Sequence, residues 1–354
     1  MATIILTGGG TAGHCIPNVA LLPYIKKYFD KIYYIGSENG LEKQIITKIK
    51  IPYFSIPCAK LDRDKKLKNF AIPFKVASGI HHAGKILDKI KPDVIFSKGG
   101  YVAVPTVLAA KKRNIPVISH ESDYTIGLAN KITSKYCKIV LTSFQETANT
   151  IKNGQFVGPP LKALNGSKTK ALNDFGLSGT KPVVLVTGGS LGAKAINTAL
   201  IDALPSLLDK FDVLHVCGKN NVQKKNLPTG YVQKEFIDDM KNAYAIADVC
   251  VSRSGSNTVF ELLCLKKPCV LIPLPKGASR GDQELNAEYF QKKGAVNVLH
   301  QSALTAQSLT TAIESTYHNK NGLIENINKL SIKNSCKEIA DILIYYANSP
   351  LKNK

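Results

Sequence analysis

Short apolar runs alternate with longer amphipathic stretches along the whole chain. The runs are rich in β-branched residues, and the segments between them are long enough for helices. Apolar strands separated by helix-length segments are typical of parallel sheets that are covered by helices on both faces. We therefore expect an α/β protein whose strands are 3–7, 32–35, 94–97, 117–119, 138–142, 183–187, 213–217, 249–252 and 270–274.

The two halves of the chain repeat one pattern. "TIILTGGGTAGH" at 3–14 matches "VVLVTGGSLGAKAIN" at 183–197, and each reads as a strand, a Thr-Gly-Gly turn and a helix. About thirty residues later each half has another apolar run that ends in glycine, which is the spacing of one βαβ unit. The repeat predicts two Rossmann-like domains in tandem rather than one long sheet.

A break between the two domains is expected near "FVGPPLK", because two consecutive prolines can continue neither a helix nor a central strand. Near the end of the chain, "CKEIADILIYYA" places its apolar residues on one helical face. A last helix that crosses back to the first domain would bury that face. The predicted domains are therefore 1–161 together with a final helix within 334–354, and 162–333.

The charge of the chain is strongly positive. It has 47 Lys and Arg against 26 Asp and Glu, a net charge of +21 at pH 7, and arginine occurs only at 63, 113, 253 and 280. A nucleic-acid reader would use more arginine, with aromatic side chains for stacking, so we expect no nucleic-acid partner. Dispersed lysine fits attraction to an anionic lipid surface and equally well a lysine-rich, soluble surface.

The sequence shows no sign of secretion or of a membrane span. Residues 1–6 lack the basic start of a secretory signal, and no apolar run approaches the roughly 20 residues of a transmembrane helix. None of the eight cysteines forms a Cys-x-x-Cys pair, so free thiols are expected rather than a disulfide framework or a zinc site. These features favour a cytosolic protein.

Two glycine-rich turns follow expected strands of the first domain, at 8–13 and in "SKGGYVAVP" at 97–105. Ligands of open α/β sheets bind at the carboxyl edge of the strands, so the two turns together indicate a wall of a ligand site. Gly8, Gly10 and Gly13 also fit a dinucleotide fingerprint. The acidic residue that would hold a ribose is poorly placed, since Glu38 is the nearest candidate, and NAD binding is therefore not favoured.

The best phosphate site lies in "SRSGSNTVFELL" at 252–263. Residues 254–258 open a helix, and their amides and hydroxyls can hold a diphosphate at a helix end that carries about +0.5 of a charge. Glu261, one turn into the helix, could accept both ribose hydroxyls or could merely balance the dipole. In "SRGDQELNAEYF", Gln283 and Glu284 could read sugar hydroxyls or simply start a capped helix.

Two histidines stand beside these turns. His14 ends the first glycine turn, where a catalytic and a structural role are both open. His120 follows an apolar strand, and Glu121 could orient it. Residues 61–87 mix lysines with Phe70 and Phe74, which suits an interfacial membrane patch or a linker into a core helix.

The ordered set "TGGGTAGH", "SKGGYVAVP", "HESDYTIGLANK", "VTGGSLGAKAIN", "FIDDM", "SRSGSNTVFE" and "GDQELNA" resembles the MurG family of peptidoglycan glycosyltransferases, within glycosyltransferase family 28. The resemblance covers almost the whole chain. It implies a GT-B fold, with two Rossmann-like domains whose parallel sheets face a cleft. The first domain would take the acceptor and the second the nucleotide.

The resemblance also implies an activity. UDP-GlcNAc would donate GlcNAc, with inversion, to the MurNAc 4-hydroxyl of undecaprenyl-pyrophosphoryl-MurNAc-pentapeptide (lipid I), which gives lipid II. No metal and no cofactor would be required. The enzyme would sit peripherally on the cytoplasmic face of the membrane, bound to its anionic inner leaflet through 61–87, with cell-wall synthesis proteins as further partners.

The family's site residues carry over one by one. Thr11, Ala12 and Gly13 would border the donor sugar and diphosphate, with His14 near the acceptor. Ser190 would touch phosphate, and the Ile237 backbone would read the uracil edge. The remaining contacts would be Ser256, Asn257 and Thr258 on phosphate and ribose, Glu261 on the ribose hydroxyls, and Gln283 on the GlcNAc hydroxyls. Asp123, Lys162 and Leu191 stand where the family often has Asn, Arg and Gln, and Lys162 keeps the charge without the bidentate fork.

Inversion requires a single in-line attack and a base for the acceptor proton. His14 is the first choice, and Glu121 is the alternative or an orienting group. Without a metal, the amides at 254–258 would stabilise the departing UDP. Two other functions stay open from the residues alone: a transferase that uses a diacylglycerol acceptor, and a dinucleotide-dependent oxidoreductase or nucleotide-binding module.

Overall fold

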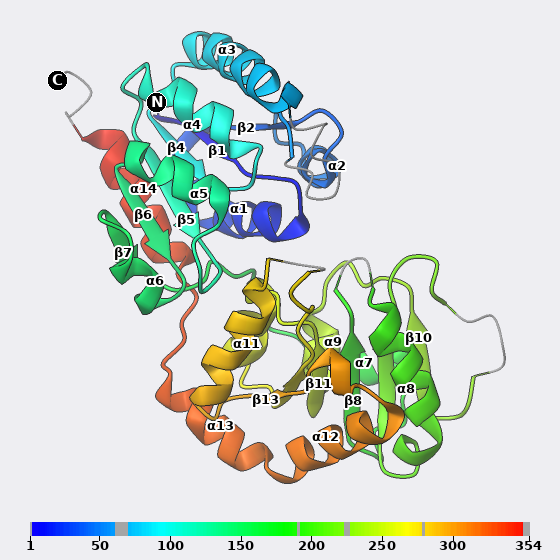
Figure 1. The fold of residues 1–354 in the computed structure, drawn as a ribbon. Coiled ribbons are helices and arrows are strands. Elements are labelled where there is room, and N and C mark those ends of the chain that lie inside the picture. The colour runs from blue at the N-terminus through cyan, green and yellow to red at the C-terminus, as the bar shows by residue number, and fades with distance from the viewer. Residues whose placement is uncertain (1, 61–69, 190–191, 223–226, 278–279, 350–354) are drawn as a thin grey trace. The chain divides into compact units, whose positions relative to one another are not determined.

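The computed structural model describes residues 2–60, 70–189, 192–222, 227–277 and 280–349. The chain divides into two compact units (Figure 1). Unit 1 is Met1–Lys162 with Asn334–Lys354, and unit 2 is Ala163–Lys333.

Unit 1 is built on a seven-stranded, all-parallel sheet in the order β3-β2-β1-β4-β5-β6-β7. Its central strands are apolar and fully buried, as expected for strands covered on both faces. The strands are β1 (Ala2–Thr7), β2 (Phe29–Ser37), β3 (Tyr53–Ile56), β4 (Val94–Ser97), β5 (Val117–Glu121), β6 (Ile139–Thr142) and β7 (Gly154–Phe156).

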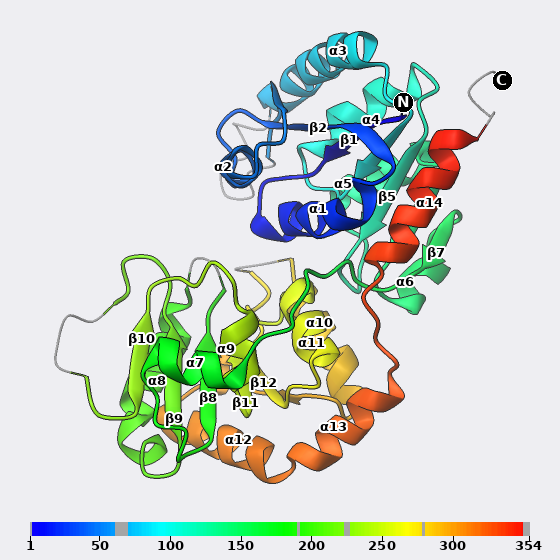
Figure 2. The same ribbon diagram turned by 180° about the vertical axis from the view of Figure 1, so that it is seen from behind.

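Helices cover both faces of this sheet (Figures 1 and 2). One hydrophobic cluster joins the sheet to α1 and α14, and another joins it to α3 and α4. The helices are α1 (Ala12–Ile25), α2 (Leu41–Lys48), α3 (Ile72–Ile90), α4 (Ala103–Lys111), α5 (Leu128–Thr133), α6 (Gln145–Asn149) and α14 (Cys336–Asn348), with a 3-10 turn at Ser134–Tyr136.

Unit 2 has a six-stranded parallel sheet in the order β10-β9-β8-β11-β12-β13, and α8 and α12 share a hydrophobic cluster on one face. Its strands are β8 (Val183–Thr187), β9 (Asp212–Val216), β10 (Tyr231–Lys234), β11 (Val249–Ser252), β12 (Cys269–Leu271) and β13 (Asn297–Val298). Its helices are α7 (Lys168–Phe175), α8 (Lys194–Leu207), α9 (Lys241–Ile246), α10 (Ser256–Cys264), α11 (Asp282–Lys292), α12 (Ala306–His318) and α13 (Lys320–Lys329), with a 3-10 turn at Gln301–Ala303.

The expected α/β class with two parallel sheets is confirmed, and each predicted strand is found at or near its predicted position. The sequence missed β3, β7, β10 and β13. These are the outermost strands of the two sheets, and most of their residues are only partly buried or exposed. An edge strand has one unpaired side and needs no continuous apolar run, so the pattern that predicts a buried strand does not find it.

Helix α14 is fixed to unit 1 at its start. The Asn334 amide donates to the Leu161 carbonyl oxygen (2.7 Å) and its oxygen accepts from the Leu161 N–H (3.1 Å). Next to it, the Ser335 hydroxyl donates to the Gly158 carbonyl oxygen (2.9 Å). These bonds pair the chain that leaves unit 1 with the chain that returns to it. Among the described residues, every helix is too short or too polar to cross a bilayer.

Candidate active site

The carboxyl ends of β1, β4 and β5 meet at one edge of the unit 1 sheet, because these strands are neighbours and parallel. The turns that follow β1 and β4 pack against each other without room for side chains. A Cβ added to Gly100, whose φ is +79°, would lie 2.3 Å from the Gly9 carbonyl oxygen and 3.4 Å from His14 Nδ1. The glycines therefore bring His14 against the second turn, as the spacing of the two motifs predicts.

A buried carboxylate supports the first glycine turn. Glu42, on α2, is fully buried and accepts from the Gly10 N–H (3.1 Å), the Ser37 N–H (3.1 Å) and the Ser37 hydroxyl. The Gly10 amide is thus bonded within the protein, beside a carboxyl group. This arrangement disfavours a dinucleotide phosphate at that amide, because its N–H is already bonded within the protein.

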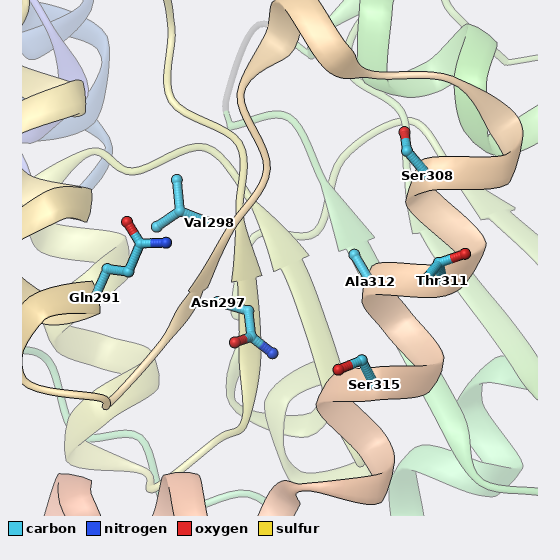
Figure 3. Close-up of a pocket in the computed structure, with 7 residues that line it drawn as sticks. All are labelled: Gln291, Asn297, Val298, Ser308, Thr311, Ala312 and Ser315. Atoms are coloured by element: carbon cyan, nitrogen blue, oxygen red, sulfur yellow. The ribbon is translucent and has the colours of Figure 1, made fainter.

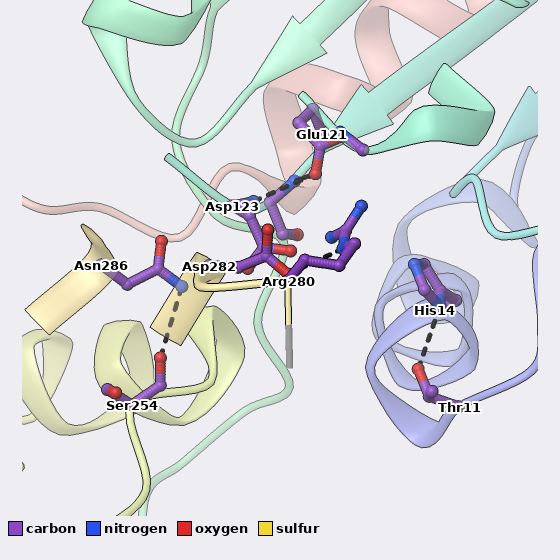
Figure 4. A network of polar contacts seen from close by, with 10 residues as sticks. Thr11, His14, Glu121, Asp123, Ser254, Arg280, Asp282 and Asn286 are labelled. Atoms are coloured by element: carbon purple, nitrogen blue, oxygen red, sulfur yellow. Dashed lines mark hydrogen bonds and ion pairs between the residues drawn. The ribbon is translucent and has the colours of Figure 1, made fainter. Parts of the chain in front are cut away.

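His14 lies in the first turn of α1, where Thr11 is the N-cap residue. Its Nδ1 is 2.9 Å from the Thr11 hydroxyl oxygen, a pair that Figure 4 shows at the end of the helix. When Nδ1 carries the hydrogen and donates to Thr11, Nε2 is the acceptor, which is the form that can take a proton from a hydroxyl. Thr11, Ala12 and Gly13 are exposed or half-buried around it.

The Glu121 carboxylate is buried and is surrounded by hydrogen-bond donors of the protein. Its carboxylate accepts from the N–H groups of Ser122 (2.9 Å), Asp123 (3.1 Å) and Gly127 (2.8 Å) and from Asn130 Nδ2 (2.9 Å). Burial and the charge of Asp123 raise its pKa, while the bonds from Gly127 and Asn130 act in the opposite direction. Glu121 therefore organises the turn between β5 and α5, and Asp123 lies half-buried in that turn.

Lys98, which the sequence gave no reason to select, is fully buried at the end of β4. Its Nζ lies 2.9 Å from His120 Nδ1 and donates also to the Ser122 hydroxyl. His120 Nε2 lies 3.1 Å from the Gly158 carbonyl oxygen, which can only accept, so Nε2 carries the hydrogen and Nδ1 accepts from the ammonium group.

The charges in this cluster are set by burial. Burial and the Lys98 charge lower the pKa of His120 well below its usual value, so the ring is neutral. Burial lowers the pKa of Lys98 to about 8, although the charges of Glu121 and Asp123 act to raise it. His120 has both ring nitrogens engaged in the interior, and Glu121 bonds to the turn rather than orienting His120. His14 therefore has the more suitable position for a base.

In unit 2, β11 ends at Ser252 and α10 begins at Ser256 after Gly255. A Cβ added to Gly255 would meet no atom of the described residues within 4 Å, so these residues leave space at this helix N-terminus. Ser256, Asn257 and Thr258 form its first turn, and the N-terminus of a helix favours an anion.

Ser254 has a structural role that differs from the expected phosphate contact. Its hydroxyl is buried and donates to the Gln283 carbonyl oxygen (2.8 Å), and its own carbonyl accepts from Asn286 Nδ2 (3.3 Å; Figure 4). Gln283 Oε1 accepts from the Leu274 N–H (3.1 Å). The structure thus joins the two motifs of the predicted donor site, while the Ser254 hydroxyl is used within the protein.

Glu261 lies in α10, half-buried, and accepts a hydrogen bond from the Tyr244 hydroxyl (2.8 Å). Tyr244 is 2 % exposed and lies on α9. Burial and the negative charge of Glu261 raise the pKa of Tyr244, so its hydroxyl is a neutral donor. The sequence did not indicate this tyrosine, since an aromatic residue in a short apolar helix is typical of a hydrophobic core.

The other predicted residues lie on connecting segments or outside the described part of the chain. Ile237 is half-buried and its neighbour Phe236 is 57 % exposed, on the segment before α9. Lys162 is exposed at the last position of the first segment of unit 1. Ser190, Leu191 and residues 61–69 of the basic patch lie outside the described residues.

A depression in unit 2 lies away from the predicted residues. It has a volume of about 380 Å³ and lies between α11, β13 and α12 (Figure 3). The lining side chains carry no charge and no imidazole or thiol group, which gives this depression no evident chemistry. They are Gln291, Asn297, Val298, Ser308, Thr311, Ala312 and Ser315.

Comparison with known proteins gives two matching domains and close relatives. Residues 4–142 match the glycosyltransferase family 28 N-terminal domain, and residues 183–343 match the glycosyltransferase family 28 C-terminal domain. A protein of Clostridium botulinum (strain Alaska E43 / Type E3) is 46% identical over 347 residues, which cover 96% of this chain and 97% of the relative. Its name is UDP-N-acetylglucosamine--N-acetylmuramyl-(pentapeptide) pyrophosphoryl-undecaprenol N-acetylglucosamine transferase.

Two further matches agree. A Clostridium perfringens (strain 13 / Type A) protein of the same name is 45% identical over 96% of this chain and 97% of its own length. The crystal structure of Acinetobacter baumannii MurG superposes with a TM-score of 0.76 at 25% sequence identity, covering 97% of this chain and 99% of that chain.

Replacement of Lys98 tests the buried cluster. Lys98→Met removes the donor to His120 and Ser122 and leaves a buried acceptor without its partner, so we expect the free energy of unfolding to fall by about 1–3 kcal/mol. Urea unfolding at pH 7 would measure it. Lys85→Met, at an exposed position of α3, should change the same quantity by no more than about 0.5 kcal/mol. Equal stability of the two variants would contradict the role given to the Lys98 ammonium group.

Proposed function

This chain belongs to glycosyltransferase family 28, within its MurG family, and on that premise we propose that it transfers N-acetylglucosamine from UDP-N-acetylglucosamine to undecaprenyl-pyrophosphoryl-MurNAc-pentapeptide (lipid I). The product is lipid II of peptidoglycan synthesis. The observation that carries this proposal is the near full-length match to relatives that bear the name of this reaction.

Unit 2 is the proposed donor site. The open N-terminus of α10 would hold the diphosphate through its first-turn amides and the hydroxyls of Ser256 and Thr258, with Asn257 beside them. Glu261 would accept the ribose hydroxyls. The Ile237 backbone would bond the uracil edge, and the Gln283 side chain would bond the GlcNAc hydroxyls. Ser190 is proposed as a phosphate contact from the sequence alone.

Unit 1 is the proposed acceptor site, and His14 is the proposed base. The acceptor 4-hydroxyl gives its proton to His14 Nε2 while its oxygen forms a bond to C1 of GlcNAc, and the bond from C1 to the diphosphate oxygen breaks. UDP leaves from the face opposite to the attack, which inverts C1. Thr11 holds the ring through Nδ1. Thr11–Gly13, Asp123 and Lys162 would line the donor sugar and diphosphate.

The start of α3 is the proposed membrane contact. Phe70 and Phe74 are 77% and 80% exposed, and the exposed side chains of Lys75 and Lys85 follow on the same helix. Large apolar side chains among cations suit insertion at an anionic headgroup layer. We place this face on the anionic inner leaflet, at the cytoplasmic side of the membrane, where a lipid-linked acceptor would be reached.

The function is tested by UDP release from UDP-GlcNAc with a short-chain lipid I analogue, in the presence of EDTA. We expect turnover with this acceptor and none with diacylglycerol. EDTA should not abolish the turnover, because the charge of departing UDP would be stabilised by amides rather than by a metal. Turnover only with diacylglycerol would change the acceptor. A strict need for added Mg²⁺ would contradict the metal-free site.

His14→Ala should lower kcat about 10²–10⁴-fold, the usual contribution of a positioned general base. UDP affinity, measured by isothermal titration calorimetry, should stay nearly unchanged because His14 belongs to unit 1. His300→Ala, at an exposed position of unit 2, serves as the matched control. An unchanged kcat in His14→Ala would remove His14 as the base.

Phe70→Ser together with Phe74→Ser should weaken binding to phosphatidylglycerol vesicles at least about tenfold. Each buried phenyl ring contributes about 1.5–3 kcal/mol on leaving water. Vesicle sedimentation measures the binding, and turnover of a soluble acceptor should not change. Phe156→Ser, an exposed phenylalanine on β7, should bind vesicles like the parent protein. Undiminished binding by the double variant would place the membrane contact elsewhere.

A further inference from the structure

We propose that Tyr244 is a positioning residue for the donor nucleoside: its hydroxyl fixes the Glu261 carboxylate and so joins the segment before α9 to helix α10. The inference rests on the proposed donor site, in which Ile237 meets the base and Glu261 meets the ribose. Tyr244 itself would touch neither.

The contact has the properties of a fixed support. Tyr244 Oη donates to Glu261 Oε2 at 2.8 Å, from a side chain that is 2 % exposed. Its backbone N–H bonds to the Met240 carbonyl oxygen (2.8 Å), at the end of the segment that contains Phe236 and Ile237. A movement of this segment would therefore be transmitted to the carboxylate through one rigid aromatic ring.

A glutamate that binds two neighbouring hydroxyls binds them more tightly when its side chain is already held in place. Ordering a glutamate side chain costs up to about 2 kcal/mol of conformational entropy. A bond that already holds Oε2 in the free protein removes part of that cost from binding. A carboxylate has two oxygens and about four acceptor positions, and the Tyr244 hydroxyl takes one of these positions.

The consequence is selectivity for ribose. A site whose polar groups are held for a substrate hydroxyl rejects an analogue that lacks it, because the site's group is then left unpaired. A carboxylate that can rotate and form hydrogen bonds with water would cost less binding free energy when the ribose hydroxyl is missing. Tyr244 should therefore raise the preference for UDP over 2′-deoxy-UDP without changing the chemical step.

The test is the ratio of the dissociation constants of 2′-deoxy-UDP and UDP, measured by calorimetry on the full chain. Tyr244→Phe removes only the hydroxyl, and we expect UDP to bind about 3–10-fold more weakly, the range of one hydrogen bond, and the ratio to fall by a similar factor. kcat at saturating UDP-GlcNAc should stay within about twofold.

Tyr231→Phe is the matched control. Tyr231 is a buried tyrosine of the same unit whose hydroxyl bonds to His215 (2.9 Å) and Gln233 (2.7 Å). Its loss should affect stability but leave the ratio unchanged. An unchanged ratio in Tyr244→Phe, or an equal fall in Tyr231→Phe, would overturn the inference.

A variant of Glu261 separates this inference from the donor site. Glu261→Gln should lower the ratio, and in that background Tyr244→Phe should lower it no further, since the two groups act through one contact. If Glu261→Gln leaves the ratio intact, Glu261 does not hold the ribose, and both the donor contact and the inference fail. If Glu261→Gln lowers the ratio and Tyr244→Phe does not, the donor contact stands and the role of Tyr244 is wrong.

Discussion

Parallel strands send all their carboxyl ends to one edge of a sheet, and both units depend on this constraint. In unit 1 it brings the turns after β1, β4 and β5 together, although the first of these strands ends at Thr7 and the other two at Ser97 and Glu121. In unit 2 it places the start of α10 beside the turn that leads into α11. Each turn alone is a weak signal. The sheet makes them neighbours, and only then do they form a site.

Buried polar groups hold these turns in place. Glu42 supports the first glycine turn, Glu121 the turn after β5, and Ser254 the two motifs of unit 2. A buried polar group that loses its partner costs about 1–3 kcal/mol, which makes each arrangement specific. The Gly158 carbonyl accepts from both His120 and Ser335, and so links the Lys98 cluster to the start of α14. The Gly158 carbonyl oxygen thus stabilises both the Lys98 cluster and the helix with which the chain returns to unit 1.

The sequence predicted the features that have a periodic or compositional signal. Central strands were found because they are continuously apolar, and edge strands such as β3 were missed because they are not. His14 and Glu261 were chosen from their place after glycine or at a helix start. Lys98 and Tyr244 were missed because a single lysine or tyrosine carries no sign of its partner, which lies more than fifteen residues away. Glu121 was considered as the alternative base or as an orienting group, and its oxygens bond to the turn that follows.

The two glycine-to-helix turns that introduce α1 and α10 differ in the acidic groups beside them, and this difference bears on the proposed place of the diphosphate. At α1 the Gly10 amide is bonded to the buried Glu42 carboxyl group. This N–H is therefore already used within the protein, and an anion could bind there only by displacing that bond. At α10 no acidic residue lies in the first turn, and the helix dipole attracts the anion. The first turn of α10 thus suits a diphosphate better than the Gly10 amide does, which agrees with the proposed place of the UDP diphosphate at Ser256 and of the acceptor hydroxyl beside His14.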